Sequence, residues 1–154
     1  MAKIALTYEG SRLVGIGQVA LTYRGFPRRP RTLGRLELSY DMLGSRLCAI
    51  GGYGVDYYDL LGFQPRTVGS WQVDYGRDGA RMTQIGPYLL TYRALGSRVA
   101  AIGPMILQYR RLGRRPRTVE LPDGAVELTE EQTVMLFIVL YSWERTRIWR
   151  SGGG

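Results

Sequence analysis

Apolar and polar residues alternate along most of the chain in short stretches separated by glycines, and a tyrosine marks the end of every second stretch. Its spacings are 15, 17, 18, 17, 17 and 17 residues, from Tyr8 through Tyr23, Tyr40, Tyr58, Tyr75, Tyr92 and Tyr109. Each of these tyrosines from Tyr23 onward is followed ten residues later by an aliphatic residue: Leu33, Ile50, Val68, Ile85, Ile102 and Val119. Since strand side chains alternate between two faces and glycine suits turns, the pattern predicts about seven 17-residue β-hairpin repeats, or about 14 strands.

A different pattern begins near the C-terminus, where Val134 to Tyr141 are eight consecutive apolar residues. Thr129 followed by Gln132 is a capping-box sequence, so we expect a helix over about residues 130–149. A helix without a polar face must be buried on all sides, and this run is too short to span a bilayer. The predicted fold is therefore mainly β: an antiparallel meander, curved or closed into a barrel around one apolar C-terminal helix, with no integral membrane span.

The length and composition indicate one domain of this kind. The chain has 154 residues, of which 45% are hydrophobic, enough for a sizeable core. We expect residues 1–150 to form the domain and residues 151–154 to be a flexible tail. The predicted first strand begins almost at Met1, which leaves no room for a signal peptide, so we expect a cytoplasmic protein.

Turn chemistry suggests how the two strands of a repeat pair. In the segment from Tyr40 to Arg46, a three-residue loop ending at Gly44 would place glycine at the left-handed position of a bulged hairpin. This register sets Tyr40 opposite Arg46 and Leu38 opposite Cys48, and it places tyrosine, leucine and isoleucine on one face. A two-residue turn at residues 43–44 is the alternative.

Two segments depart from the simple repeat. The fourth unit, residues 51–58, has one extra residue and places Asp56 where other units have Leu or Val. A bulge before Tyr58 or a slipped alignment would each explain it. After Val119, residues 120–127 contain Pro122, Asp123 and Gly124, which predicts a final hairpin.

Two copies, Tyr40-Asp41-Met42-Leu43-Gly44-Ser45-Arg46 and Tyr58-Asp59-Leu60-Leu61-Gly62, resemble the tyrosine–aspartate (YD, or RHS) repeat. Over about 110 residues the other copies keep the tyrosine and glycine and replace the aspartate. The resemblance implies strings of β-hairpins, which in that family spiral into large secreted shells that enclose a toxin or bind sugars. This chain has too few repeats to close such a shell, so the resemblance applies to the repeat unit and not to the function.

The charge is strongly positive and almost all of it is arginine. The net charge is +8, from 20 Arg, one Lys and 13 acidic residues. An arginine recurs beside the tyrosines, at Arg12, Arg29, Arg46, Arg81, Arg98 and Arg115, with Gln64 as the exception. Arginine laid across a tyrosine ring would be structural, whereas an exposed column of arginines would bind phosphates. Both interpretations are open from the sequence.

Three copies of Pro-Arg-Thr, at Pro30, Pro65 and Pro116, occupy one equivalent position of repeats two, four and seven. Proline cannot donate to a sheet, so this position is a strand start, a bulge or an edge. The densest basic segments surround two of these copies. If the protein binds a polyanion, the residues we expect to bind it are Arg28, Arg29, Arg31, Arg110, Arg111, Arg114, Arg115 and Arg117.

Catalytic and metal-binding patterns are scarce. The chain has no histidine, one cysteine, Cys48, and no nucleotide-binding loop or nucleophile elbow, so we expect no metal, no cofactor and no enzyme activity. The only candidate catalytic groups are the carboxylate pairs Asp56 with Asp59 and Asp74 with Asp78.

Two functions follow from these patterns. The first is a non-catalytic structural or protein-interaction protein that presents a rigid β-surface to a protein partner, or to another copy of itself through edge strands. The alternative is an anion-binding module for nucleic acid or acidic lipid, through the repeats rich in arginine and tyrosine. Binding that weakens steeply with added salt would distinguish the second from the first.

Overall fold

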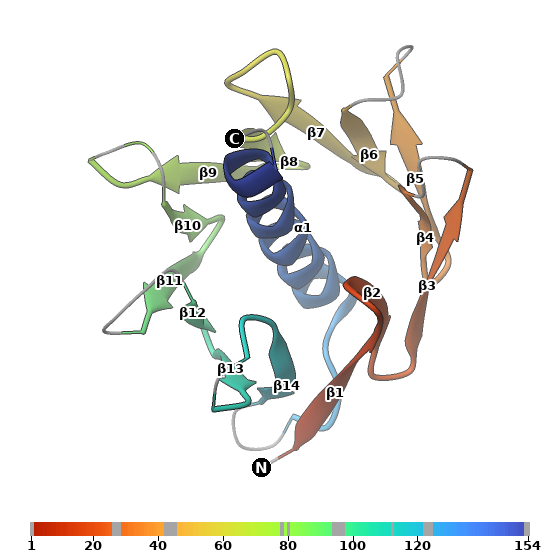
Figure 1. Ribbon diagram of the computed structural model, residues 1–154, viewed down its shortest axis with the longest axis vertical. Coiled ribbons are helices and arrows are strands. Elements are labelled where there is room, and N and C mark those ends of the chain that lie inside the picture. The colour runs from red at the N-terminus through yellow and green to blue at the C-terminus, as the bar shows by residue number, and fades with distance from the viewer. Residues whose placement is uncertain are drawn as a thin grey trace.

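The structure is a computed structural model that describes residues 2–25, 29–41, 46–77, 79, 81–93, 98–111, 113–121 and 125–152, without the side chains of 147–152. In this part of the chain fourteen strands precede one helix (Figure 1). The strands are β1 (Lys3–Glu9), β2 (Arg12–Ile16), β3 (Val19–Arg24), β4 (Arg29–Leu33), β5 (Leu36–Tyr40), β6 (Leu47–Ile50), β7 (Tyr53–Tyr57), β8 (Pro65–Val68), β9 (Trp71–Tyr75), β10 (Met82–Ile85), β11 (Tyr88–Tyr92), β12 (Val99–Ile102), β13 (Met105–Tyr109) and β14 (Pro116–Glu120). The helix is α1 (Glu130–Gly152).

The strands form one closed antiparallel barrel. Each strand pairs with its neighbours in the chain, and β1 pairs with β14, with Ile4 opposite Val119. Every hairpin directs one buried or half-buried apolar pair inward: Leu6 with Ile16, Leu21 with Leu33, Leu38 with Ile50, Val55 with Val68, Val73 with Ile85, Leu90 with Ile102, and Leu107 with Val119. The predicted barrel is therefore confirmed, and it is closed.

The helix fills the barrel (Figure 1). Residues 134–139 of α1 are all buried and belong to the same apolar cluster as the inward strand residues. The capping box is present: the N–H of Gln132 donates to Oγ1 of Thr129 at 3.1 Å, and the N–H of Thr129 donates to Oε1 of Gln132 at 3.0 Å. The helix runs on to Gly152, three residues beyond the predicted end, and residues 153–154 lie outside the described part.

The register of the hairpins differs from the predicted one. Leu38 pairs with Ile50, and Tyr40 pairs with Leu47 rather than with Arg46. The reason is a β-bulge: Cys48 is an extra residue between the positions opposite Ser39 and Tyr40, and the same shift occurs beside the tyrosine of all seven hairpins. The bulge keeps tyrosine, leucine and isoleucine on the inner face, as predicted. Gly44 lies outside the described residues.

The predictions for the two irregular segments have different outcomes. In the fourth unit Tyr57, not Tyr58, holds the tyrosine position and pairs with Pro65, so the slipped alignment was the right alternative. The extra residue lies in the connection between Tyr57 and Pro65, and the bulge of this hairpin lies where it does in the other six. The final hairpin is wrong: residues 125–128 form no strand, and 122–124 lie outside the described residues.

The barrel has two different ends. At one, which we call the glycine end, two-residue turns join the hairpins at 17–18, 34–35, 51–52, 69–70, 86–87 and 103–104. The first residue of each is a glycine with φ between 55° and 60° and the second has no positive φ, as in type II′ turns. The other end, which we call the tyrosine end, holds the seven ring tyrosines, the longer connections and the point where α1 leaves the barrel.

Candidate functional site

A ring of tyrosines closes the tyrosine end. The hydroxyl of each one donates to a main-chain carbonyl ten residues earlier, in the preceding hairpin, as in Tyr23 to Leu13 at 2.6 Å. The others are Tyr40 to Pro30, Tyr57 to Leu47, Tyr75 to Pro65, Tyr92 to Met82 and Tyr109 to Val99, at 2.5 to 2.8 Å. Tyr8 completes the ring by donating to Pro116 at 2.7 Å. Burial raises the pKa of these phenols, to about 12 for Tyr23 and Tyr109.

Arginines cover the outer side of this ring. Each guanidinium lies over the tyrosine eleven residues later, at 4.3 to 6.0 Å from the ring centre: Arg12 over Tyr23, Arg29 over Tyr40, Arg46 over Tyr57, Arg81 over Tyr92 and Arg98 over Tyr109. Where Gln64 interrupts the series, the ring of Tyr58 packs against Tyr75 instead, at 5.9 Å. These arginines therefore have the structural role that stacking implies, worth about 0.5–2 kcal/mol each.

The Pro-Arg-Thr copies lie at the bulges. Pro30, Pro65 and Pro116 are buried at the starts of β4, β8 and β14, and each supplies a carbonyl to the tyrosine ring. The arginine that follows each proline is the bulged residue, and its side chain is exposed. The predicted position at a strand start or bulge is confirmed.

Charge is segregated between the ends. We count as the tyrosine end the connections from each ring tyrosine to its partner residue and the helix from Tyr141 onward. Among the side chains that the structure describes, this end has 13 Arg and 4 acidic residues, whereas the rest has 5 basic and 7 acidic residues. Among the described side chains, the tyrosine end thus carries all of the excess positive charge.

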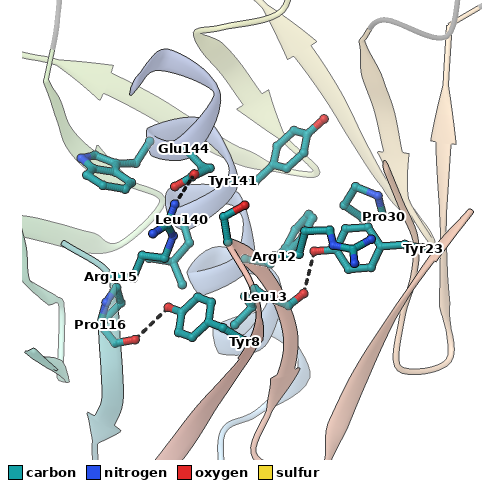
Figure 2. A pocket seen from close by; sticks show the side chains of 13 residues that line it. Tyr8, Arg12, Leu13, Tyr23, Pro30, Arg115, Pro116, Leu140, Tyr141 and Glu144 are labelled. Carbon is teal, nitrogen blue, oxygen red and sulfur yellow. Dashed lines mark hydrogen bonds and ion pairs between the residues drawn. The ribbon is translucent and has the colours of Figure 1, made fainter. Parts of the chain in front are cut away.

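The tyrosine end also has a pocket of about 160 Å³ between β1, β2, β14 and α1 (Figure 2). Its walls are mainly apolar, with Leu13, Phe137 and Leu140 inside and Trp143 beside them. Pro30 and Pro116 both line it, so the first and last Pro-Arg-Thr copies meet at one site although 86 residues separate them. A cavity of this size holds an aromatic ring or a short aliphatic segment.

Polar groups stand around this pocket. Arg115 pairs with Glu144 of α1 at 2.7 Å, while Arg12 pairs with Glu9 at 3.1 Å and lies over Tyr23 (Figure 2). The Nε of Arg115 is buried and has no hydrogen-bond partner. Since a buried unsatisfied donor costs about 1–3 kcal/mol, this N–H is a suitable donor for an oxygen atom of a ligand.

The pocket exists because the first hairpin is short. Tyr8 pairs with Leu13 across a five-residue interval, whereas Tyr40 and Leu47 are seven apart. The first connection is thus two residues shorter, which explains why Tyr8 and Tyr23 are 15 residues apart rather than 17. Because this connection is shorter, the tyrosine end extends less far here than at the other hairpins. A gap between β2, β14 and α1 therefore remains open.

The predicted anion-binding residues fall into separate groups. Arg29 and Arg31 line a second, polar hollow of about 280 Å³ on the outer wall, together with Arg24, Glu37 and Asp41. Arg110, Arg111 and Arg114 are exposed in the connection between β13 and β14, Arg115 lines the pocket, Arg117 is exposed on β14, and Arg28 lies outside the described residues. The sequence alone did not bring Tyr8, Arg12 and Glu144 together as one site; the short spacing between Tyr8 and Tyr23 was the available signal for the first two.

The candidate catalytic carboxylates have local partners. Asp56 pairs with Arg66, which lowers the pKa of the Asp56 carboxyl. Both oxygens of Asp59 accept main-chain N–H groups, and Asp74 accepts from Gln72 at 3.1 Å. Asp78 lies outside the described residues. None of the three described carboxylates lines the pocket.

Comparison of the chain with protein-family models, with curated proteins and with solved structures finds no match. In the described part of the chain, α1 is not long and apolar enough to cross a membrane.

Proposed function

We propose that this protein is a non-catalytic binding module that recognises an anionic partner through its tyrosine end. The observation that carries the proposal is the segregation of charge, with 13 Arg against 4 acidic residues at that end among the described side chains. Focused positive charge attracts polyanions and raises their association rate about 10- to 1000-fold. A guanidinium group can also donate two hydrogen bonds at once to the oxygens of a phosphate or a carboxylate.

Closure of the barrel favours this function over self-association. An exposed edge strand offers unpaired N–H and C=O groups to another chain. Each of the fourteen described strands pairs on both sides, so none of them is an edge. The arginines that stack on tyrosines still carry their charge, and Arg110, Arg111 and Arg114 add exposed charge beside them.

The proposal is tested by retention on heparin, with salt concentration at elution as the measurement. We expect the protein to bind at low salt and to elute as salt rises, because release of counterions drives such binding. The double variant Arg110→Gln, Arg111→Gln should elute at clearly lower salt.

The matched control removes two charges elsewhere. Lys3 is exposed near the glycine end, and Arg35 pairs there with Glu130 at the surface. The variant Lys3→Gln, Arg35→Gln has the same net charge as the test variant and should elute nearly with the wild type. Flow-through of the wild type at low salt, or equal shifts for both double variants, would overturn the proposal.

A second candidate function is the binding of a small amphipathic anion in the pocket, favoured by the unpartnered Nε of Arg115 above apolar walls. Anilinonaphthalene sulfonate is a suitable fluorescent probe. Its fluorescence should rise with the wild type and with Leu89→Trp, on the exposed outer wall, but not with Leu140→Trp, which fills the pocket. An equal response of all three proteins would exclude the pocket as the site.

A further inference from the structure

The connection between β7 and β8 exposes a cluster of apolar side chains at the tyrosine end. Leu60 is 89% exposed, Leu61 52% and Tyr58 54%. In Figure 1 this connection is the yellow loop beside the C-terminal end of α1. The other large hydrophobic residues exposed in the described part are Leu89 and Ile106 on the barrel wall and Val126 before the helix. Only this loop combines exposed leucines with the positively charged end.

The inner side of the loop is held firmly. The Asp59 carboxylate accepts the N–H of Phe63, at 3.0 and 3.1 Å, and the N–H of Gln64, at 2.9 Å. Arg145 of α1 donates to the carbonyl of Leu61 at 3.1 Å and lies over the ring of Phe63 at 5.1 Å. The fold therefore braces this loop in a conformation that leaves Leu60 and Leu61 in water.

Positive charge accompanies the leucines. Arg145 lies directly under the loop, and Arg46, whose guanidinium pairs with Asp41 at 3.1 Å, packs so closely behind Gly62 that a Cβ there would lie 2.6 Å from its Cγ. The only acidic residue of the loop, Asp59, is engaged by main-chain N–H groups. A surface that binds this loop must accept aliphatic side chains and guanidinium groups together.

We propose that the anionic partner is the surface of a lipid bilayer, into whose headgroup region Leu60 and Leu61 insert while the arginines of the tyrosine end contact lipid phosphates. This inference rests on the proposed function and names its partner. Proteins that lie at a bilayer surface bury apolar side chains at the boundary between headgroups and acyl chains and add arginine or lysine for anionic lipid.

Nucleic acid fits the same end less well. Single strands bind by stacking bases on exposed aromatic rings. Here five of the seven ring tyrosines lie under a guanidinium group, and a sixth, Tyr75, packs against the ring of Tyr58. All seven hydroxyls donate to main-chain carbonyls. In the exposed cluster Leu60 and Leu61 offer a base no stacking face, and the ring of Tyr58, which is 54% exposed, already packs edge-on with that of Tyr75.

The experiment is co-sedimentation with vesicles at low salt. We expect binding to vesicles of phosphatidylcholine mixed with phosphatidylglycerol and little binding to pure phosphatidylcholine. The variant Leu60→Ser, Leu61→Ser should bind the mixed vesicles at least about tenfold more weakly, because each leucine loses its favourable transfer from water. Leu89→Ser, Ile106→Ser is the matched control, which removes two exposed aliphatic side chains from the barrel wall, 62% and 46% exposed, and should bind as the wild type does.

Heparin retention separates the two proposals. If the leucine variant keeps normal retention on heparin and loses vesicle binding, both proposals are supported. If the wild type binds heparin but not the mixed vesicles, or if both serine variants bind vesicles equally, the bilayer inference is wrong and the anion-binding function stands. Tighter binding to a single-stranded oligonucleotide than to the vesicles, unchanged by Leu60→Ser, Leu61→Ser, would assign nucleic acid instead. No retention on heparin would overturn both.

Discussion

The hydroxyl of Tyr8 donates to the carbonyl oxygen of Pro116 at 2.7 Å, across 108 residues of chain. The same bond joins neighbouring hairpins six times elsewhere, always across ten residues. The repeat thus uses one interaction both to stack each hairpin on the previous one and to join the last hairpin to the first. Closure needs no special element, only a ring of seven units.

Tyr8→Phe removes this bond and keeps the ring. We expect it to lower the free energy of unfolding by about 1–3 kcal/mol, because the carbonyl of Pro116 loses its partner in a half-buried setting. Urea denaturation followed by circular dichroism measures the loss. Tyr92→Phe is the matched control, since it deletes the same bond to Met82 within the chain. A loss for Tyr92→Phe with none for Tyr8→Phe would show that the tyrosine bond does not hold the ends together.

The hairpin count and the barrel could be predicted because both depend on local patterns. The alternation of residues such as Leu38 and Tyr40 assigns faces, and the apolar run from Val134 requires a surrounding wall. The register could not be predicted in the same way. The bulge at Cys48 interrupts the alternation of β6, because the inward residues Leu47 and Ile50 are three positions apart, so a strict period of two gives the wrong register.

The candidate site was predicted only in part. Arg115 and the Pro-Arg-Thr prolines were identified from the repeat pattern and the dense basic segments, but the pocket forms only after closure brings Tyr8 to Pro116. Glu144 enters it from the helix, whose angular setting inside the barrel no local pattern specifies. Leu60 and Leu61 stand between Asp59 and Gly62 as Met42 and Leu43 stand between Asp41 and Gly44, so the sequence did not distinguish them from the same positions of another copy.

High pH should unfold the protein through its tyrosines. The folded pKa of Tyr23 and Tyr109 is raised to about 12, against about 10 in the unfolded chain. Above pH 10 the unfolded state releases these protons first, so stability is full below about pH 10 and falls as the pH rises toward 12. Absorbance at the tyrosinate band and far-ultraviolet circular dichroism should therefore change together. Ionisation of all tyrosines near pH 10 without unfolding would contradict the buried ring.

A substitution at Gly103 should strain a tight turn. This glycine has φ of 55°, and a Cβ on it would lie 2.6 Å from Cγ and Cδ1 of Tyr88. We expect Gly103→Ala to destabilise the fold by about 1–3 kcal/mol, a fall in Tm of a few degrees per kcal/mol. Gly52→Ala is the control, because Gly52 has no positive φ and a Cβ added to it would meet no atom within 4 Å. Equal Tm values for the two variants would contradict this turn geometry.

Two leucines of α1, one turn apart, should respond differently to truncation. Leu136 is fully buried inside the barrel, whereas Leu140 is half-buried and borders the pocket (Figure 2). We expect Leu136→Ala to cost about 2–5 kcal/mol, because the barrel wall cannot collapse into the space it leaves. Leu140→Ala should cost clearly less, since water already reaches part of its surface and the substitution only enlarges an existing pocket. Chemical denaturation of both variants measures the difference. A cost for Leu140→Ala equal to that for Leu136→Ala would mean that the pocket is closed in solution and that residue 140 belongs to the sealed core.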